Sequence, residues 1–268
     1  MSRDPHISIR SIKKLGSKFL STEDVPYRIQ RANHAFHQLW RLWKSRIRVS
    51  LELRMRMYNA FIKPILLYNA GSLDLSIKQT NAFDVLHRKH LRIILGIFYP
   101  KTITNVELYE QCKVSPISAY IIQSRWQLFG HTLRMSRSTP AQKVMKIYFQ
   151  THDEFAQTKK KQQKAHNLLP QLLHNDLRSS FLKAPLQSYE DLKKLREYAK
   201  DRQQWQWLVA DIFSSATEQI LATLLTLLGK RRSTHQKPNA AETPSLLEST
   251  TNQDAFLPNA DKDSDIHN

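Results

Sequence analysis

The sequence predicts an all-α protein, and three observations support this prediction. Apolar residues recur at intervals of three and four along most of the chain, and no segment alternates apolar and polar residues for more than a few positions. Residues that commonly cap helices precede these apolar runs. Only five glycines interrupt the 268 residues, of which 41% are hydrophobic, so the chain is long and apolar enough to bury a core.

The first predicted helices lie between residues 21 and 67. Ser21 precedes two acidic residues, and Pro26 is expected to open the first helix. One face of this helix is apolar and consists of Ile29, Ala32, Phe36, Leu39, Trp40 and Trp43. Ser50 is expected to cap the next apolar run, which Pro64 should end or kink because proline has no amide hydrogen.

Later helix starts are marked by paired capping residues and by prolines. Three pairs have capping-box spacing, in which each residue satisfies a free backbone amide of the other: Ser76 with Gln79, Thr104 with Glu107, and Ser188 with Asp191. Pro116 and Pro140 are expected at the first positions of two further helices. Gly130 is expected to end or bend the helix that Pro116 opens.

Composition divides the chain into five segments. Residues 157–164 are polar and basic without apolar periodicity, and the last residues are polar, acidic and contain proline, which is typical of disordered segments. The predicted segments are a lead-in at 1–24, a basic helical domain at 25–152, a basic linker at 153–167, a smaller helical unit at 168–230 and a disordered acidic tail at 231–268.

The positive charge is concentrated in the predicted helical domain. The whole chain has a formal net charge of +18. Residues 25–152 contain twenty Lys and Arg against five acidic residues, a net charge of +15, whereas residues 231–268 have a net charge of −2. Because Lys and Arg gain free energy by releasing counterions from phosphates, a folded basic surface points to the backbone of RNA or DNA as the partner.

Cysteine content and hydropathy favour an intracellular protein. The lone Cys112 cannot form an internal disulfide, and residues 1–20 do not resemble a signal peptide. Residues 208–228 are the most apolar stretch, but they contain Asp211 and Glu218. We therefore interpret them as a buried or partner-binding helix and expect no membrane partner. The choice between nucleus and cytoplasm stays open, as does the oligomeric state.

No catalytic centre and no cofactor site are predicted. Two-metal nucleotidyl transfer needs converging carboxylates, but no two aspartates are adjacent in this chain. A phosphate-binding loop needs closely spaced glycines, and the five glycines lie far apart. We therefore expect a protein that is not an enzyme on its own and that needs no cofactor.

Four residues offer a zinc site as an alternative. His87 and His90 lie one helical turn apart, and Cys112 and His131 could supply two further ligands. The second two residues are isolated and lack the paired spacing of such sites, so no metal site is predicted. An enzyme that acts through these residues is the less favoured hypothesis. Otherwise, His87 is expected to contact phosphate or polar neighbours.

Basic clusters provide the candidate nucleic-acid contacts. Arg88 and Arg92 lie four residues apart on one side of a predicted helix, where guanidinium groups can bind phosphate oxygens. The predicted backbone contacts are Arg88, Lys89, Arg92, Arg125, His131 and Arg134, with Lys159, Lys160 and Lys161 as a flexible anchor. Trp40, Trp43 and Trp126 either stack on bases or, as their helical spacing favours, pack in the core.

Six segments carry motifs that follow one another in a characteristic order: residues 14–17, 57–68, 87–96, 104–109, 125–135 and 201–209. In this order and spacing, the chain resembles the C-terminal part of reverse transcriptases encoded by non-LTR (LINE-type) retrotransposons. Residues 57–68 are similar to the family's lYnsfv-P-llYg helix, and residues 125–135 to its R-W-lGH-lRM stretch. The six matches together extend over residues 12–209, which is most of the chain.

Two departures from the family stand out. Leu15 and Gly16 stand where the family has a tyrosine-leucine-glycine turn at the primer grip, but Lys14 replaces the tyrosine. After Tyr68, the family's GaEtW motif is missing, and the sequence reads Asn69-Ala70-Gly71-Ser72-Leu73 without the tryptophan. Leu15 and Gly16 are therefore interpreted as the remains of a primer-grip turn.

The resemblance implies a helical thumb-like bundle and a post-thumb region that grip an RNA template, a DNA primer or a DNA target site. In the family, the fingers, the palm and the metal-binding aspartates lie upstream of the matched segments. RNA-directed DNA polymerisation therefore does not carry over to this chain. We expect a nucleic-acid-binding fragment, and the alternative is a helical protein-interaction scaffold that uses residues 208–228.

Overall fold

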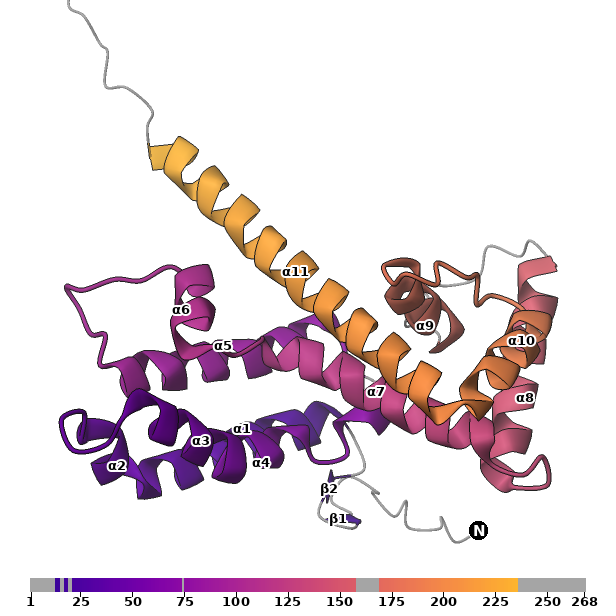
Figure 1. The fold of residues 1–268 in the computed structure, drawn as a ribbon, viewed down its shortest axis with the longest axis horizontal. Coiled ribbons are helices and arrows are strands. Elements are labelled where there is room, and N and C mark those ends of the chain that lie inside the picture. The colour runs from indigo at the N-terminus through magenta and orange to yellow at the C-terminus, as the bar shows by residue number, and fades with distance from the viewer. Residues whose placement is uncertain (1–12, 15–16, 19–20, 74, 158–168, 236–268) are drawn as a thin grey trace, which may run out of the picture.

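The computed structural model confirms that the protein is all-α (Figure 1). It describes residues 13–14, 17–18, 21–73, 75–157 and 169–235. Two short antiparallel strands come first, β1 (Lys13–Lys14) and β2 (Ser17–Lys18), with Lys13 opposite Lys18. They flank Leu15 and Gly16, the expected primer-grip remnant, which lies outside the described residues.

Helices make up nearly all of the remaining described chain. The first group is α1 (Ser21–Gln38), α2 (Trp40–Lys44), α3 (Leu51–Phe61), α4 (Lys63–Leu67), the 3₁₀ turn η1 (Ala70–Ser72), α5 (Ile77–Leu95) and α6 (Asn105–Cys112). The second group is α7 (Ile117–Arg134), α8 (Pro140–Gln157), α9 (Leu169–Arg178), α10 (Tyr189–Lys200) and α11 (Arg202–His235). Figure 1 shows α11 as the longest rod, lying across α7.

The predicted helix starts are largely confirmed. All three capping boxes form, at the starts of α5, α6 and α10. Ser50 accepts a hydrogen bond from the Leu53 amide at the start of α3, at 3.2 Å. The helix is interrupted between α3 and α4, just before Pro64, as expected because proline has no amide hydrogen. These features are local, so a few neighbouring residues are enough to determine them.

Several predicted helix boundaries are wrong. α1 begins at Ser21 and contains Pro26, because two acidic residues in its first turn suit the positive end of the helix dipole. α8 continues to Gln157, so the expected linker at 153–167 begins with helix. α11 continues to His235, five residues into the expected tail at 231–268. The rest of that tail, and residues 158–168 of the linker, lie outside the described residues.

Gly130 was expected to end or bend its helix, and the helix end is wrong, because Gly130 lies inside α7. A Cβ atom at this position would overlap with the indole nitrogen of Trp205. That indole belongs to α11, is 3% exposed and donates a hydrogen bond to the Trp126 carbonyl at 3.2 Å. Glycine is therefore required here because the backbone of α7 and the Trp205 ring lie in direct contact.

We expect Gly130→Ala to lower the free energy of unfolding by about 1–3 kcal/mol, the usual effect of overpacking a well-packed core. Without the Trp205 contact the same substitution should raise the free energy of unfolding, because alanine stabilises a helix interior by about 1 kcal/mol relative to glycine. Urea unfolding followed by circular dichroism measures the change. In a Trp205→Leu background the same substitution should have a much smaller effect. A Gly130→Ala protein that is as stable as the parent contradicts the contact.

The buried apolar residues form two clusters that share α7. The first cluster lies among α1 to α6 and includes Ile117 and Ile121 from the start of α7. The second cluster contains Trp126 and Phe129 from later in α7, together with residues of α8, α9, α10 and α11. The second cluster thus combines residues from both predicted helical segments, 25–152 and 168–230. The packing does not separate these segments.

Candidate nucleic-acid interface

The predicted ridge of Arg88 and Arg92 on α5 faces α6. The guanidinium of Arg92 donates to Asn105 Oδ1 at 2.7 Å, and that of Arg88 donates to the Tyr109 hydroxyl at 3.4 Å, so both contact α6. Lys89 is exposed and borders a cavity beside Pro26 and neighbouring residues of α1. The two arginines thus lie against α6, whereas Lys89 borders α1, and their contact with phosphate stays a prediction.

Arg125 is not available as a phosphate contact, contrary to the expectation from the sequence. Its guanidinium forms an ion pair with Asp176 of α9 at 2.9 Å, and the two side chains are only 12% and 11% exposed. The same carboxylate accepts a hydrogen bond from Trp126 Nε1 at 3.0 Å. Burial raises the pKa of Asp176, and Arg125 opposes that shift. Arg125 thus holds α9 against α7.

Arg134 and His131 lie near the end of α7, and their environments differ. Arg134 is half-buried and donates to the Ala199 carbonyl at 3.2 Å, while burial and the charge of Arg202 lower its pKa. His131 is exposed. The expected anchor formed by Lys159, Lys160 and Lys161 lies outside the described residues.

Two of the three candidate tryptophans are core residues. Trp43 and Trp126 are fully buried, and Trp43 donates its indole hydrogen to the Phe36 carbonyl at 2.7 Å. Trp40 is half-buried, packs against the first cluster and has Lys44 Nζ 4.9 Å from its ring centroid. Base stacking on Trp43 or Trp126 would require unpacking of the core, so the core interpretation holds for both.

His87 and His90 belong to a buried hydrogen-bonded network in the first cluster. The Tyr58 hydroxyl lies 3.0 Å from His87 Nδ1 and 3.4 Å from His90 Nδ1. The ring of Phe36 stacks on His90 with centroids 3.9 Å apart. Burial lowers the pKa of each histidine to about 3, so both are neutral at pH 7. The expected contact of His87 is therefore with polar neighbours and not with phosphate.

The alternative zinc site is not assembled. Cys112 is buried, and burial raises the pKa of its thiol to about 11, whereas His131 is exposed on α7. In the described part of the chain, no three His, Cys, Asp or Glu residues come together in a way that could hold a metal ion.

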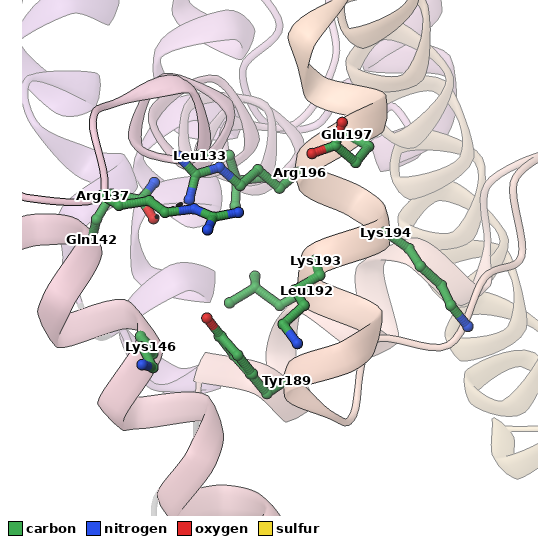
Figure 2. A pocket seen from close by; sticks show the side chains of 10 residues that line it. All are labelled: Leu133, Arg137, Gln142, Lys146, Tyr189, Leu192, Lys193, Lys194, Arg196 and Glu197. Atoms are coloured by element: carbon green, nitrogen blue, oxygen red, sulfur yellow. Dashed lines mark hydrogen bonds between the residues drawn. The ribbon is translucent and has the colours of Figure 1, made fainter.

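A basic cleft between α8 and α10 is the strongest candidate for an interface (Figure 2). Its volume is about 280 Å³. We call it the α8–α10 cleft. Its charged lining consists of Arg137, Lys146, Lys193, Lys194, Arg196 and Glu197. Five of these six side chains are basic and one is acidic. Lys194 points away from the centre of the cleft in Figure 2, whereas Arg196 reaches across it toward Gln142 on α8.

Neutral partners hold Arg196 in position. Its guanidinium donates to the Met135 carbonyl at 3.0 Å and to Gln142 Oε1 at 3.3 Å. The Gln142 amide in turn donates to the Thr132 carbonyl on α7. Because these acceptors are uncharged, they orient the guanidinium without cancelling its charge. The result is a fixed positive group at the wall of the cleft.

The nearby acids do little to neutralise the cleft. Glu197 pairs with Lys200, whose hydrogen bond is the largest cause of its lowered pKa, with Arg196 and Arg137 contributing. Lys193 pairs with Glu190 at 2.5 Å, but both side chains are at least half exposed, so the pair is weak and easily exchanged. The cleft therefore retains a positive field.

Sequence reasoning pointed to the end of α7 but missed the cleft. Its charged residues span positions 137 to 197 and come from the turn between α7 and α8, from α8 and from α10. Lys193 and Lys194 are adjacent basic residues in the sequence, but no sequence pattern near them indicates that they line the same cleft as Lys146. Only the packing of α10 on α7 and α8 brings these charges together.

A larger cavity beside the cleft has a different character. Its volume is about 670 Å³, and it lies between η1, α7, α8 and α9. Its lining is mainly apolar and includes Phe129, Val144 and Leu172. Its one charged side chain, Arg125, is already paired with Asp176. Such a lining does not suit a polyanion.

The long helix α11 is only partly a core helix. Within the described residues, Arg202–Leu228 is long and apolar enough to cross a membrane, with a mean hydropathy of 1.3. Of its most apolar 18-residue stretch, 22% is buried in the protein. Trp205, Leu208 and Ile212 are buried in the second cluster, whereas Leu225 and Leu227 are about half exposed. The first half therefore belongs to the second cluster, and Leu221 and Leu224 farther along α11 pack against the first cluster. A protein partner for residues 208–228 stays a prediction.

No protein-family model, no curated protein and no solved structure matches this chain. The resemblance to LINE-type reverse transcriptases therefore rests on the motifs of the sequence alone. What supports a function beyond those motifs is the charge of the chain and the geometry of the α8–α10 cleft.

Proposed function

We propose that this protein binds the phosphate backbone of RNA or DNA and has no catalytic centre of its own. The observation that carries this proposal is the α8–α10 cleft, whose charged lining has five basic side chains and one acidic side chain, Glu197, which pairs with Lys200. Lys and Arg on a folded surface release condensed counterions when they bind phosphates, and this release supplies most of the backbone affinity.

The cationic surface extends beyond the cleft. Arg134, at the end of α7, lies beside Arg202 at the start of α11, next to the end of α10. These residues border the corner where α10 meets α11. A strand that enters the cleft would thus meet further positive charge on leaving it, as an extended polyanion requires.

The sequence motifs suggest where such a protein comes from. The order of its segments supports a remnant or partial product of a LINE-type reverse transcriptase, whose parent activity is RNA-directed DNA polymerisation. Because the family's metal-binding aspartates lie upstream of the matched region, the proposal includes no polymerase step. Its partners are an RNA template, a DNA primer or a DNA target site.

Fluorescence-anisotropy titrations with labelled RNA, DNA and hybrid duplex test the proposal. We expect binding at low salt and an affinity that falls steeply as salt rises, because each phosphate contact contributes about 0.7–0.9 to the slope of log K against log salt. Arg137→Gln combined with Lys146→Gln should reduce that slope by roughly 1 to 2 and weaken binding to all three ligands.

The matched control is Arg48→Gln combined with Lys101→Gln, which removes one exposed arginine and one exposed lysine outside the cleft. This control should retain most of the affinity. An equal loss in both double variants contradicts a role for the cleft. Absent binding at low salt, or binding that does not respond to salt, rules out the backbone proposal itself.

A further inference from the structure

An acidic segment follows the basic helices in the chain. Residues 239–268 contain six acidic side chains and one lysine, a net charge of −5 in a protein whose net charge is +18. This segment lies outside the described residues. Its acidic side chains are Glu242, Glu248, Asp254, Asp261, Asp263 and Asp265. A chain with several carboxylates along it is itself a polyanion, so it is a candidate competitor for a site that binds phosphates.

The α8–α10 cleft offers the complementary charge. Arg137 and Lys146 line it and are exposed, and neither belongs to the two ion pairs described at the cleft. Arg196 is oriented by the uncharged Met135 carbonyl and Gln142 side chain, so its own charge is not cancelled by them. A concave site lined by one sign of charge concentrates its field. The cleft should therefore attract carboxylates more strongly than an isolated exposed cation does.

The acidic segment is long enough to reach the cleft. Lys200 ends α10 and Arg202 begins α11, so the cleft lies near the start of α11, and Figure 1 shows the other end of α11 far from α10. At about 1.5 Å per residue, the 34 residues of α11 correspond to about 51 Å. Asp261 follows His235 by 26 residues, which allow up to about 86 Å of chain at about 3.3 Å per residue.

We propose that residues 239–268 occupy the α8–α10 cleft when no nucleic acid is bound, with their carboxylates against its cations, and that RNA or DNA has to displace them. The contact is intramolecular, so it does not depend on the protein concentration. The phosphates of a nucleic acid are more closely spaced than these carboxylates, so they can displace the segment. This inference rests on the proposed function, because it names a competitor for the same site.

Zero-length carbodiimide cross-linking of the full chain tests the contact without nucleic acid. The reagent joins a carboxylate to a lysine amine only where the two are in contact, and mass spectrometry of the peptides identifies the pair. We expect the aspartates within 261–265 to be joined to the cleft lysines Lys146, Lys193 and Lys194, and high salt should abolish these links. Absent links, or links that favour the exposed Lys101 outside the cleft, overturn the proposal. Links between labelled and unlabelled copies in a mixture of the two also overturn it.

The same contact predicts tighter nucleic-acid binding when the acidic segment loses charge. Asp261→Asn, Asp263→Asn and Asp265→Asn together should raise the affinity of the full chain for a labelled DNA oligonucleotide at low salt. The expected gain is about 3- to 10-fold, since each exposed ion pair contributes roughly 1.4- to 5-fold. In the Arg137→Gln, Lys146→Gln protein the same three substitutions should give less than about half of that gain, because the segment has less to bind there.

The matched control changes the net charge equally at other places. Glu52→Gln, Glu110→Gln and Glu218→Gln together remove three exposed carboxylates from α3, α6 and α11. This control should raise the affinity by less than about 2-fold. Equal gains in the two triple variants overturn the proposal, because net charge alone then explains them.

The cross-links and the affinities separate the inference from the proposed function. Salt-sensitive DNA binding without cross-links in the cleft and without a gain in the triple aspartate variant overturns the inference and leaves the proposed function intact. Cross-links in the cleft of a protein that binds neither RNA nor DNA at low salt refute the proposed function and support only the intramolecular contact.

Discussion

Arg125→Met should lower the free energy of unfolding by about 3–5 kcal/mol, the usual effect of removing one partner from a buried ion pair. The side chains of Arg125 and Asp176 are 12% and 11% exposed, so solvent screens their interaction only weakly. Without Arg125, the Asp176 carboxylate remains buried with no neighbouring cation among its described contacts. Burial already raises its pKa, and loss of Arg125 should raise it further. Urea unfolding at pH 7 measures the loss.

The double variant Arg125→Met, Asp176→Leu is the matched control. It removes both charges and should recover much of the lost stability, because well-packed apolar residues commonly replace a buried ion pair without penalty. Nucleic-acid affinity of the folded double variant should stay close to that of the parent. If affinity collapses while stability is unchanged, Arg125 contacts the ligand directly and the assignment of a purely structural role is wrong.

Acid should destabilise the protein between about pH 6.5 and pH 3 through His87 and His90. Burial lowers the pKa of both imidazoles to about 3 in the folded protein, against about 6.5 for an ordinary histidine. Below pH 6.5 the unfolded chain therefore binds protons that the folded protein does not bind. The stability from these groups is full above pH 6.5 and falls as the pH falls, by about 1.4 kcal/mol per pH unit for each group. The combined loss reaches several kcal/mol near pH 4.5.

The effect of the two histidines on the pH dependence of stability has to be distinguished from that of buried carboxyl groups. Burial raises the pKa of Asp84 and Asp176, and these groups favour the folded state as the pH falls. The difference in pH slope between wild type and His90→Gln isolates one histidine from that opposing effect. An unchanged slope in His90→Gln contradicts the buried, neutral state of His90.

Local signals in the sequence predict where helices begin more reliably than where they end. Ser76 with Gln79 forms the predicted box because both partners lie within one turn of backbone. Pro64 separates α3 from α4 because its ring removes an amide hydrogen wherever it stands. The apolar stripe of α1 also holds, since Ala32 and Phe36 are fully buried.

The misplaced predictions share a physical cause, which is contact between residues far apart in the chain. Glycine is typical of helix ends, but at Gly130 the Trp205 ring from α11 occupies the space that a side chain would take. Arg125 reads in the sequence as an unpaired cation, but it forms an ion pair with Asp176, which lies on α9. The charges of the α8–α10 cleft likewise meet only through packing. Periodicity and spacing carry no information about such pairs.

The sharing of α7 between the two apolar clusters limits how the chain can be dissected in the laboratory. At about 1.5 Å per residue, its 18 residues form a strut of about 27 Å that anchors both halves. A fragment that ends near residue 152 keeps Trp126, Phe129 and Phe149 but discards the Leu173 and Trp205 side chains of the same cluster. Such a fragment would expose apolar surface and tend to aggregate. Useful truncations should therefore lie outside residues 21–235, at the two ends of the chain.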